Sequence, residues 1–208
     1  MVIPIETFSL FLGASVILAL APGPDNIFVL TQSALHGRSA GLFMTLGLCT
    51  GVVIHTSAVA LGIAAVFAAS SLAFTALKMF GVGYLLYLAW SYFRAGAKIL
   101  DSEDIILSRT KLYARGVIMN VSNPKVAIFF LAFFPQFTDP EMGNLGLQIM
   151  ILGAIFIFVT FLIFGSVAWF AGCLGKILRD SRYFQIVMNR IAGLLFLGLA
   201  VRLISAER

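Results

Sequence analysis

Charged residues are scarce in this 208-residue sequence: they occupy 11% of its positions, while apolar residues occupy 61%. Soluble domains carry about 25% charged and roughly 45–50% apolar residues, so the composition excludes an ordinary soluble fold. The mean hydropathy of +1.03 is typical of a polytopic membrane protein, and the apolar runs leave no room for a soluble catalytic domain. The lipid bilayer is therefore the first expected partner.

Cysteines and catalytic motifs are scarce too. Cys49 and Cys173 lie in separate apolar runs, far from any Cys/His cluster, which indicates neither a metal site nor a disulfide. No GxxxxGK[ST], HExxH or GxSxG sequence occurs, and His36 and His55 have no evident nucleophile as a partner. We therefore expect no enzyme activity, no metal, no cofactor and no direct coupling to ATP.

The net charge of +5 follows the membrane topology and does not predict nucleic-acid binding. Ten of the fourteen basic residues lie in alternate segments between apolar runs, which the positive-inside rule makes cytoplasmic. The opposite loops and the N-terminal segment carry none, so both termini are expected on the periplasmic side. The last of the six apolar runs is the weakest, so five spans remain an alternative. The runs cover residues 5–35, 40–68, 72–93, 116–137, 145–174 and 186–204.

Six alternating spans divide into two halves of three that cross the membrane in opposite directions. We therefore predict an all-α transporter domain over residues 1–208, built as a 3+3 inverted repeat. Its halves are about 1–94 and 112–208, joined by a cytoplasmic linker at about 95–111. The stretches PDNIFVL from Pro24 and PKVAIFFL from Pro124 interrupt the first and fourth spans in the same way. Matching interruptions in two halves are typical of a transporter binding site.

Proline predicts where these two spans break. Pro22 and Pro24 end one helix near Ala21, and Pro24 suits the first position of the next helix, with Gly23 as its cap. A rise of about 1.5 Å per residue places Pro24 about 20 Å from Arg38, and Pro124 about 13 Å from Arg115. Both breaks therefore lie near the bilayer midplane. Unpaired backbone groups there need protein, water or a ligand.

The chemistry of the breaks suits a zwitterion. Two helix N-termini would converge there and favour a carboxylate, while the carbonyls freed at the preceding helix ends would favour an ammonium. The predicted substrate-binding residues at the breaks are Pro22, Gly23, Pro24, Asn26, Asn123 and Pro124.

Asp25, His55 and Lys125 are ionisable residues away from the ends of their spans, where their cost makes them functional candidates. Asp25 and Lys125 follow the two break prolines, and they could pair, bind substrate or exchange a proton. Alternatively, Asp25 stabilises the first turn of its helix and Lys125 extends to the cytoplasmic surface. His55 is a candidate proton relay, although a hydrogen bond to a neighbouring helix explains it as well.

Four stretches together resemble the LysE/RhtB family of amino-acid exporters, the lysine and homoserine–threonine efflux family. They occur in order through the first four spans: PGPDNIFVLTQSALHGRSAGL (22–42), GLCTGVVIHTSAVALG (47–62), LKMFGVGYLLYLAWSYFR (77–94) and SNPKVAIFFLAFFPQF (122–137). The first and last are the specific ones. The resemblance implies a bacterial inner-membrane exporter of amino acids or their derivatives, driven by the proton motive force.

The predicted function is secondary export of a small amino acid, homoserine-, threonine-, leucine- or lysine-like, by proton antiport. Asp25 is the candidate proton-coupled carboxylate. The alternative is a passive channel, or an exporter of another small solute or ion, because the same broken helices could line a pore. Glycine-rich helices are compatible with a homo-oligomer.

Overall fold

The computed structural model describes residues 3–69, 71–96, 107–180 and 182–205, and all regular structure in them is helical. The predicted all-α class is confirmed for these residues. The helices are α1 (Ile5–Leu20), α2 (Pro24–His36), α3 (Arg38–Ala69), α4 (Ser71–Arg94), α5 (Arg109–Val121), α6 (Pro124–Ile128), the π-helix η1 (Phe129–Phe133), the 3₁₀ helices η2 (Phe134–Phe137) and η3 (Pro140–Met142), α7 (Leu145–Asp180) and α8 (Arg182–Ser205).

Both predicted helix breaks are present. The axes of α1 and α2 meet at 59°, and α5 meets the segment Pro124–Phe137 at 50°. Pro24 and Pro124 lie in the first turns of α2 and α6, and the residues before them, Gly23 and Asn123, are extended N-caps. Proline has no N–H to lose at that position, which is why each new helix begins there.

Among the described residues, three helical segments are long and apolar enough to cross a bilayer: Arg38–Gly62, Leu145–Ala171 and Gln185–Ser205. The two bent pairs would raise the number to five if each crosses once. The last apolar run, the weakest in the sequence, thus lies in a full-length span. The 24-residue α4 is not among these segments, so the sixth span and the inverted repeat stay predictions.

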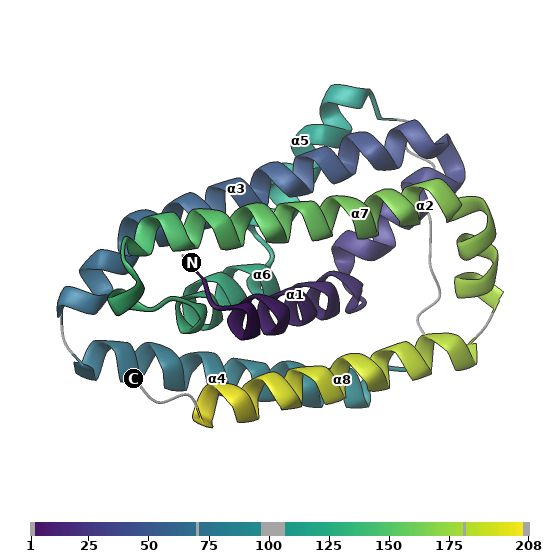
Figure 1. Cartoon of the computed structure of the whole chain (residues 1–208). Helices are drawn as coiled ribbons and strands as arrows, with labels where there is room; N and C mark the ends of the chain where they lie inside the picture. The colour runs from purple at the N-terminus through teal and green to yellow at the C-terminus, as the bar shows by residue number, and fades with distance from the viewer. Residues whose placement is uncertain (1–2, 70, 97–106, 181, 206–208) are drawn as a thin grey trace.

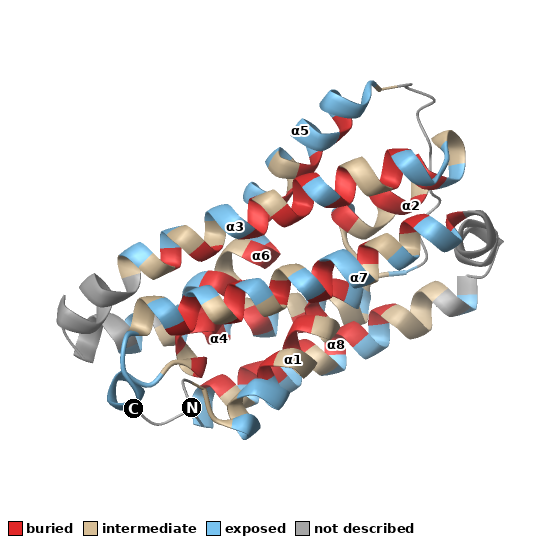
Figure 2. Cartoon of the chain, turned by 45° about the horizontal axis from the view of Figure 1, so that its top comes forward, coloured by how far each residue is buried: buried red, intermediate tan, exposed pale blue. Residues whose placement is uncertain are grey.

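The broken helices lie inside the bundle. In Figure 1, α3 and α7 run side by side above α1 and α6, while α4 and α8 run side by side below them. The α5 helix packs on α3, and α1 and α2 pack on α7. Figure 2 shows that buried residues are concentrated where these layers meet. At the breaks this packing buries Asp25, Asn123 and Lys125, while Pro24 and Pro124 are exposed.

Glycine allows the close approach of α3 and α5. A Cβ added to Gly47 would lie 2.1 Å from the Tyr113 carbonyl oxygen, and one added to Gly116 would lie 2.4 Å from the Met44 carbonyl oxygen. Gly51 is equally confined, because its added Cβ would lie 2.5 Å from Asn120 Oδ1. The four-residue spacing of Gly47 and Gly51 places both on one face of α3, where small residues permit close helix packing.

Basic residues gather at one end of the bundle, where α3, α5 and α8 begin and α4 ends. Several of their guanidinium groups stack on aromatic rings, three of them on a neighbouring helix and that of Arg94 within α4. The four pairs at this end are Arg38 on Trp169, Arg94 on Trp90, Arg109 on Phe43 and Arg115 on Phe28, with 4.2–5.4 Å between guanidinium and ring centre. Lys98 and the side chains of Cys173, Lys176, Arg179 and Arg182 lie outside what the structure describes.

Phenylalanines fill the other half of the bundle. The rings of Phe130 and Phe134 stack 4.4 Å apart, and Phe11 meets the edges of Phe134 and Phe137 at 5.1 Å. All four are 3% exposed or less. Arg202 near the end of α8 stacks on Phe137, so this cluster lies toward the end of the bundle that holds both termini (Figure 2).

Candidate functional site

Lys125 closes the end of α1. Its Nζ donates hydrogen bonds to the carbonyl oxygens of Leu18 at 3.3 Å and Ala21 at 3.1 Å. Only 7% of the residue is exposed, so its side chain does not extend to the surface as one interpretation had it. Gly23 leaves room for the ammonium, because an added Cβ would lie 3.2 Å from Nζ. The freed carbonyls of α1 therefore do hold an ammonium, and it is the protein's own.

Two more side chains satisfy backbone carbonyls at the same break. Asn26 Nδ2 donates to the Ala19 carbonyl oxygen at 2.8 Å. The Tyr92 hydroxyl, from α4, donates to the Pro22 carbonyl oxygen. Unpaired carbonyls are costly in hydrocarbon, and here side chains from α2, α4 and α6 remove that cost together.

Asp25 joins the two breaks. It is 3% exposed, and its Oδ2 accepts a hydrogen bond from Asn123 Nδ2 at 2.9 Å. Asn123 also caps α6, because its Oδ1 accepts from the Lys125 backbone N–H at 3.0 Å. Within the part of the chain described, Asp25 and Lys125 form no ion pair closer than 4.0 Å, and Asp25 Oδ1 has no hydrogen-bond partner. The two breaks are thus linked by a hydrogen bond between an amide and a carboxylate.

His55 lies next to the second break, because the Asn120 carbonyl oxygen that it contacts also accepts from the Asn123 N–H at 3.1 Å. Its Nε2 is 3.3 Å from the Asn120 carbonyl oxygen of α5, and its ring stacks on Phe130 with centres 5.4 Å apart. The hydrogen bond joins α3 to α5, as the structural interpretation of this residue expects. Its role as a proton relay stays a prediction.

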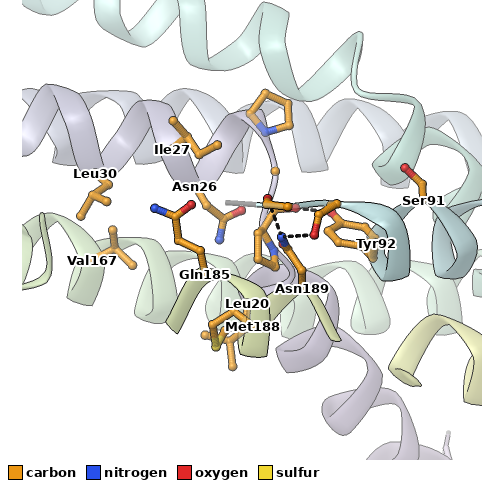
Figure 3. Close-up of a pocket in the computed structure, with 15 residues that line it drawn as sticks. Leu20, Asn26, Ile27, Leu30, Ser91, Tyr92, Val167, Gln185, Met188 and Asn189 are labelled. Carbon is orange, nitrogen blue, oxygen red and sulfur yellow. Dashed lines mark hydrogen bonds between the residues drawn. The ribbon is translucent and has the colours of Figure 1, made fainter. Parts of the chain in front are cut away.

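A cavity of about 530 Å³ lies beside the first break, between α2, α4 and the first half of α8 (Figure 3). Its lining residues are Leu20, Pro22, Gly23, Pro24, Asn26, Ile27, Leu30, Ser91, Tyr92, Ala95, Gly96, Val167, Gln185, Met188 and Asn189. Ligand cavities commonly occupy about 300–1,000 Å³ and are mostly apolar with a few polar groups. This cavity fits that description.

The cavity includes only part of the predicted binding set. Pro22, Gly23, Pro24 and Asn26 line it, whereas the second break does not. Asn123, Pro124, Asp25 and Lys125 are absent from its lining. The structure therefore brings a charged cluster together next to a cavity that the charges themselves do not line.

Sequence reasoning missed the contribution of α4 and α8. Tyr92 of α4 and Asn189 of α8 line the cavity, but neither was among the predicted binding residues. The Asn189 Nδ2 is 3.4 Å from the carbonyl oxygens of Ala95 and Gly96. A polar residue inside an apolar run is itself a signal for a site. Applied to Asn189, that signal would have identified α8 as part of the cavity lining.

Comparisons with known proteins place the chain among transporters. Residues 16–207 match the family described as LysE type translocator. The chain is 33% identical over 203 residues to a homoserine/homoserine lactone efflux protein of Salmonella typhimurium, covering 97% of this chain and 98% of that protein. It is 30% identical over 204 residues, 98% of each chain, to a Vibrio cholerae protein named an uncharacterized membrane protein.

No solved structure matches the chain. The family match covers nearly the whole sequence, including both helix breaks and every described residue of the cavity. The chain therefore belongs to the LysE family of membrane translocators.

Proposed function

We propose that this protein exports small amino acids or their derivatives from the cytoplasm in exchange for protons. Family membership supports export, and the name of the Salmonella relative supports an amino-acid-like substrate. The observation that carries the proposal is the hydrogen bond between Asp25 and Asn123, which joins two helix breaks beside a cavity. Discontinuous helices meeting inside the membrane are where secondary transporters bind substrate and coupling ions.

The proposed architecture is six spans in a 3+3 inverted repeat, in which α4 is a span in addition to the five counted above. The packing supports this, because α3 pairs with α7 and α4 with α8, while α5 lies on α3 much as α1 and α2 lie on α7. The basic end of the bundle faces the cytoplasm by the positive-inside rule. Both termini then lie in the periplasm, and the membrane is the bacterial inner membrane.

In this orientation the cavity belongs to the cytoplasmic half. It is bordered by Ala95 and Gly96, which directly follow the end of α4, and by Gln185 near the start of α8. The phenylalanine cluster around Phe130 and Phe134 closes the periplasmic half. The arrangement corresponds to an inward-facing carrier, whose substrate enters from the cytoplasm and leaves after the cluster opens. A permanently open channel would need no such plug.

Asp25 is the proposed proton-coupled group. As a carboxylate it accepts a charge-assisted hydrogen bond from Asn123, and such bonds are about twice as strong as neutral ones. Protonation weakens this contact between the two halves, which gives the proton a way to change their relative position. One charge moved across 100 mV supplies about 2.3 kcal/mol, which is roughly a fiftyfold gradient.

The test is transport by purified protein in proteoliposomes loaded with a panel of amino acids, with and without a proton gradient. We expect the gradient to accelerate export by the wild type. Asp25→Asn should lose this acceleration and still exchange labelled for unlabelled substrate. Undiminished gradient-driven export by the variant would remove Asp25 from coupling. Transport without counterflow would instead favour the channel, and no transport of any panel member would refute the proposal.

A further inference from the structure

The cavity carries no charge, unlike the neighbouring cluster that contains Asp25 and Lys125. None of the described residues that line it has an acidic or basic side chain. The nearby charged residues Asp25 and Lys125 do not line it; Asp25 Oδ2 binds Asn123, and Lys125 binds the carbonyls at the end of α1. A charged substrate side chain entering this space would find no counter-ion on the described walls.

The polar side chains of the lining are amides and hydroxyls, and two of them, Asn26 and Tyr92, lie at the helix break. Asn26 Oδ1 is buried and has no hydrogen-bond partner, while the Nδ2 of the same amide is held by Ala19. An unpaired buried acceptor favours a ligand that brings an N–H donor. The first turn of α2 borders the same space, and no side chain caps it. The polar main-chain groups of an amino acid therefore match this end of the cavity.

The opposite wall is apolar. Leu30 and Val167 lie together to one side of Asn26, and Leu20 and Met188 lie below it in the view of Figure 3. These side chains come from α1, α2, α7 and α8, so the apolar wall is built from four helices. A volume of about 530 Å³ exceeds what a small side chain such as that of alanine needs. Burial of each CH₂ group of a ligand here contributes about 0.8 kcal/mol.

We propose that this cavity selects amino acids or derivatives with an uncharged, apolar side chain of leucine or methionine size or larger. It rejects lysine- and glutamate-like side chains. The selectivity rests on the proposed export function and narrows its substrate class. Its physical origin is the cost of an unpaired charge in a low-dielectric space, set against the gain from apolar burial. Asn26 is the residue that orients the amino group.

Counterflow in proteoliposomes tests this selectivity. With the wild type, labelled leucine and methionine should be exchanged at least about tenfold more efficiently than labelled lysine or glutamate. Met188→Glu places a carboxylate on the apolar wall and should raise lysine exchange relative to leucine by a similar factor. Met188→Gln is the matched control, because it has nearly the same size and polarity as Met188→Glu without the charge, and it should raise the lysine-to-leucine ratio much less than Met188→Glu does.

The outcomes separate this selectivity from the function on which it rests. If the wild type exchanges lysine or glutamate as well as leucine, amino-acid export stands and the selectivity is wrong. If Met188→Gln raises lysine exchange as much as Met188→Glu, charge is not the determinant and the inference also fails. If no amino acid is exchanged at all, the proposed function fails first. Should Met188→Glu not fold, as judged by size-exclusion chromatography, the wild-type ratio alone decides.

Discussion

Replacing Asn123 by alanine is expected to break both connections that this side chain makes at the centre of the bundle. Its Nδ2 donates to Asp25 Oδ2 at 2.9 Å, and its Oδ1 accepts from the Lys125 N–H at 3.0 Å. The other oxygen of Asp25 already lacks a partner. The variant therefore leaves a carboxylate that is 3% exposed without any hydrogen bond from a described side chain.

The size of the effect follows from these two bonds. A hydrogen bond to a charged group contributes about 1.5–3 kcal/mol, and loss of an N-cap costs about 1 kcal/mol. Together they predict that Asn123→Ala lowers the free energy of unfolding by about 3 kcal/mol. In an Asp25→Asn background the lost contact is neutral and contributes only about 1 kcal/mol. The same change should then cost roughly 2 kcal/mol.

A charge exchange provides the matched control. Asn123→Asp keeps the cap on α6 and places a second carboxylate opposite Asp25, so it should be the least stable variant of the series. The double variant Asp25→Asn/Asn123→Asp restores one carboxylate and one amide, and it should recover most of the lost stability. Unfolding in mixed detergent–SDS micelles, followed by helical circular dichroism, measures the free energies of unfolding of the whole series.

The series measures whether Asp25 and Asn123 are energetically coupled. If Asn123→Ala costs the same in the wild-type and in the Asp25→Asn background, within about 0.5 kcal/mol, the two residues are not coupled and the contact does not join the halves. A double variant no more stable than Asn123→Asp alone would lead to the same conclusion. In that case the residual stability of the break would have to come from Lys125 and the carbonyls of α1.

Three further changes test the packing and the cavity. Gly47→Ala places a Cβ 2.1 Å from a backbone oxygen of α5 and should lower the free energy of unfolding by about 1–3 kcal/mol; Gly83→Ala, with nothing within 4 Å, is the control and should not. Tyr92→Phe removes the hydroxyl that donates to the Pro22 carbonyl and should cost about 1–3 kcal/mol, measured in the same unfolding assay; an unchanged value would show that another group satisfies that carbonyl. Ile27→Trp fills part of the cavity, so methionine counterflow should fall more than alanine counterflow; equal losses would place the substrate elsewhere.

The positions of the helix breaks were predictable because proline acts locally. Its missing N–H and its ring exclude a helix interior whatever surrounds them, so Pro24 and Pro124 could be placed from sequence alone. The α3 glycines were predictable for a related reason, since their four-residue spacing places them on one face of any helix. Signals of this kind need no knowledge of which helices are neighbours.

Predicting the walls of the cavity would have required knowing which helices are neighbours. Tyr92 and Asn189 reach the break only because α4 and α8 run side by side past it, and no local pattern states that pairing. The contact made by Lys125 could not be predicted for the same reason. The sequence offered a pairing with Asp25, substrate binding, proton exchange or a route to the surface, and the contact that Lys125 makes depended on where the end of α1 lies. The carbonyls of α1 are within reach, so the ammonium binds there.

The two breaks carry opposite charges at matching positions, and helix dipoles explain why the arrangement is stable. Asp25 lies in the first turn of α2, where a negative charge is favourable. Lys125 lies in the first turn of α6, where a positive charge is unfavourable for its own helix. Its side chain instead reaches the carbonyl end of α1, whose partial negative charge suits an ammonium. The second half therefore supplies both groups that the broken helix of the first half needs: Asn123 bonds Asp25, and Lys125 bonds the carbonyl end of α1. Moving the halves apart would expose these groups together, so any step that separates them must first neutralise or replace the charges at the break.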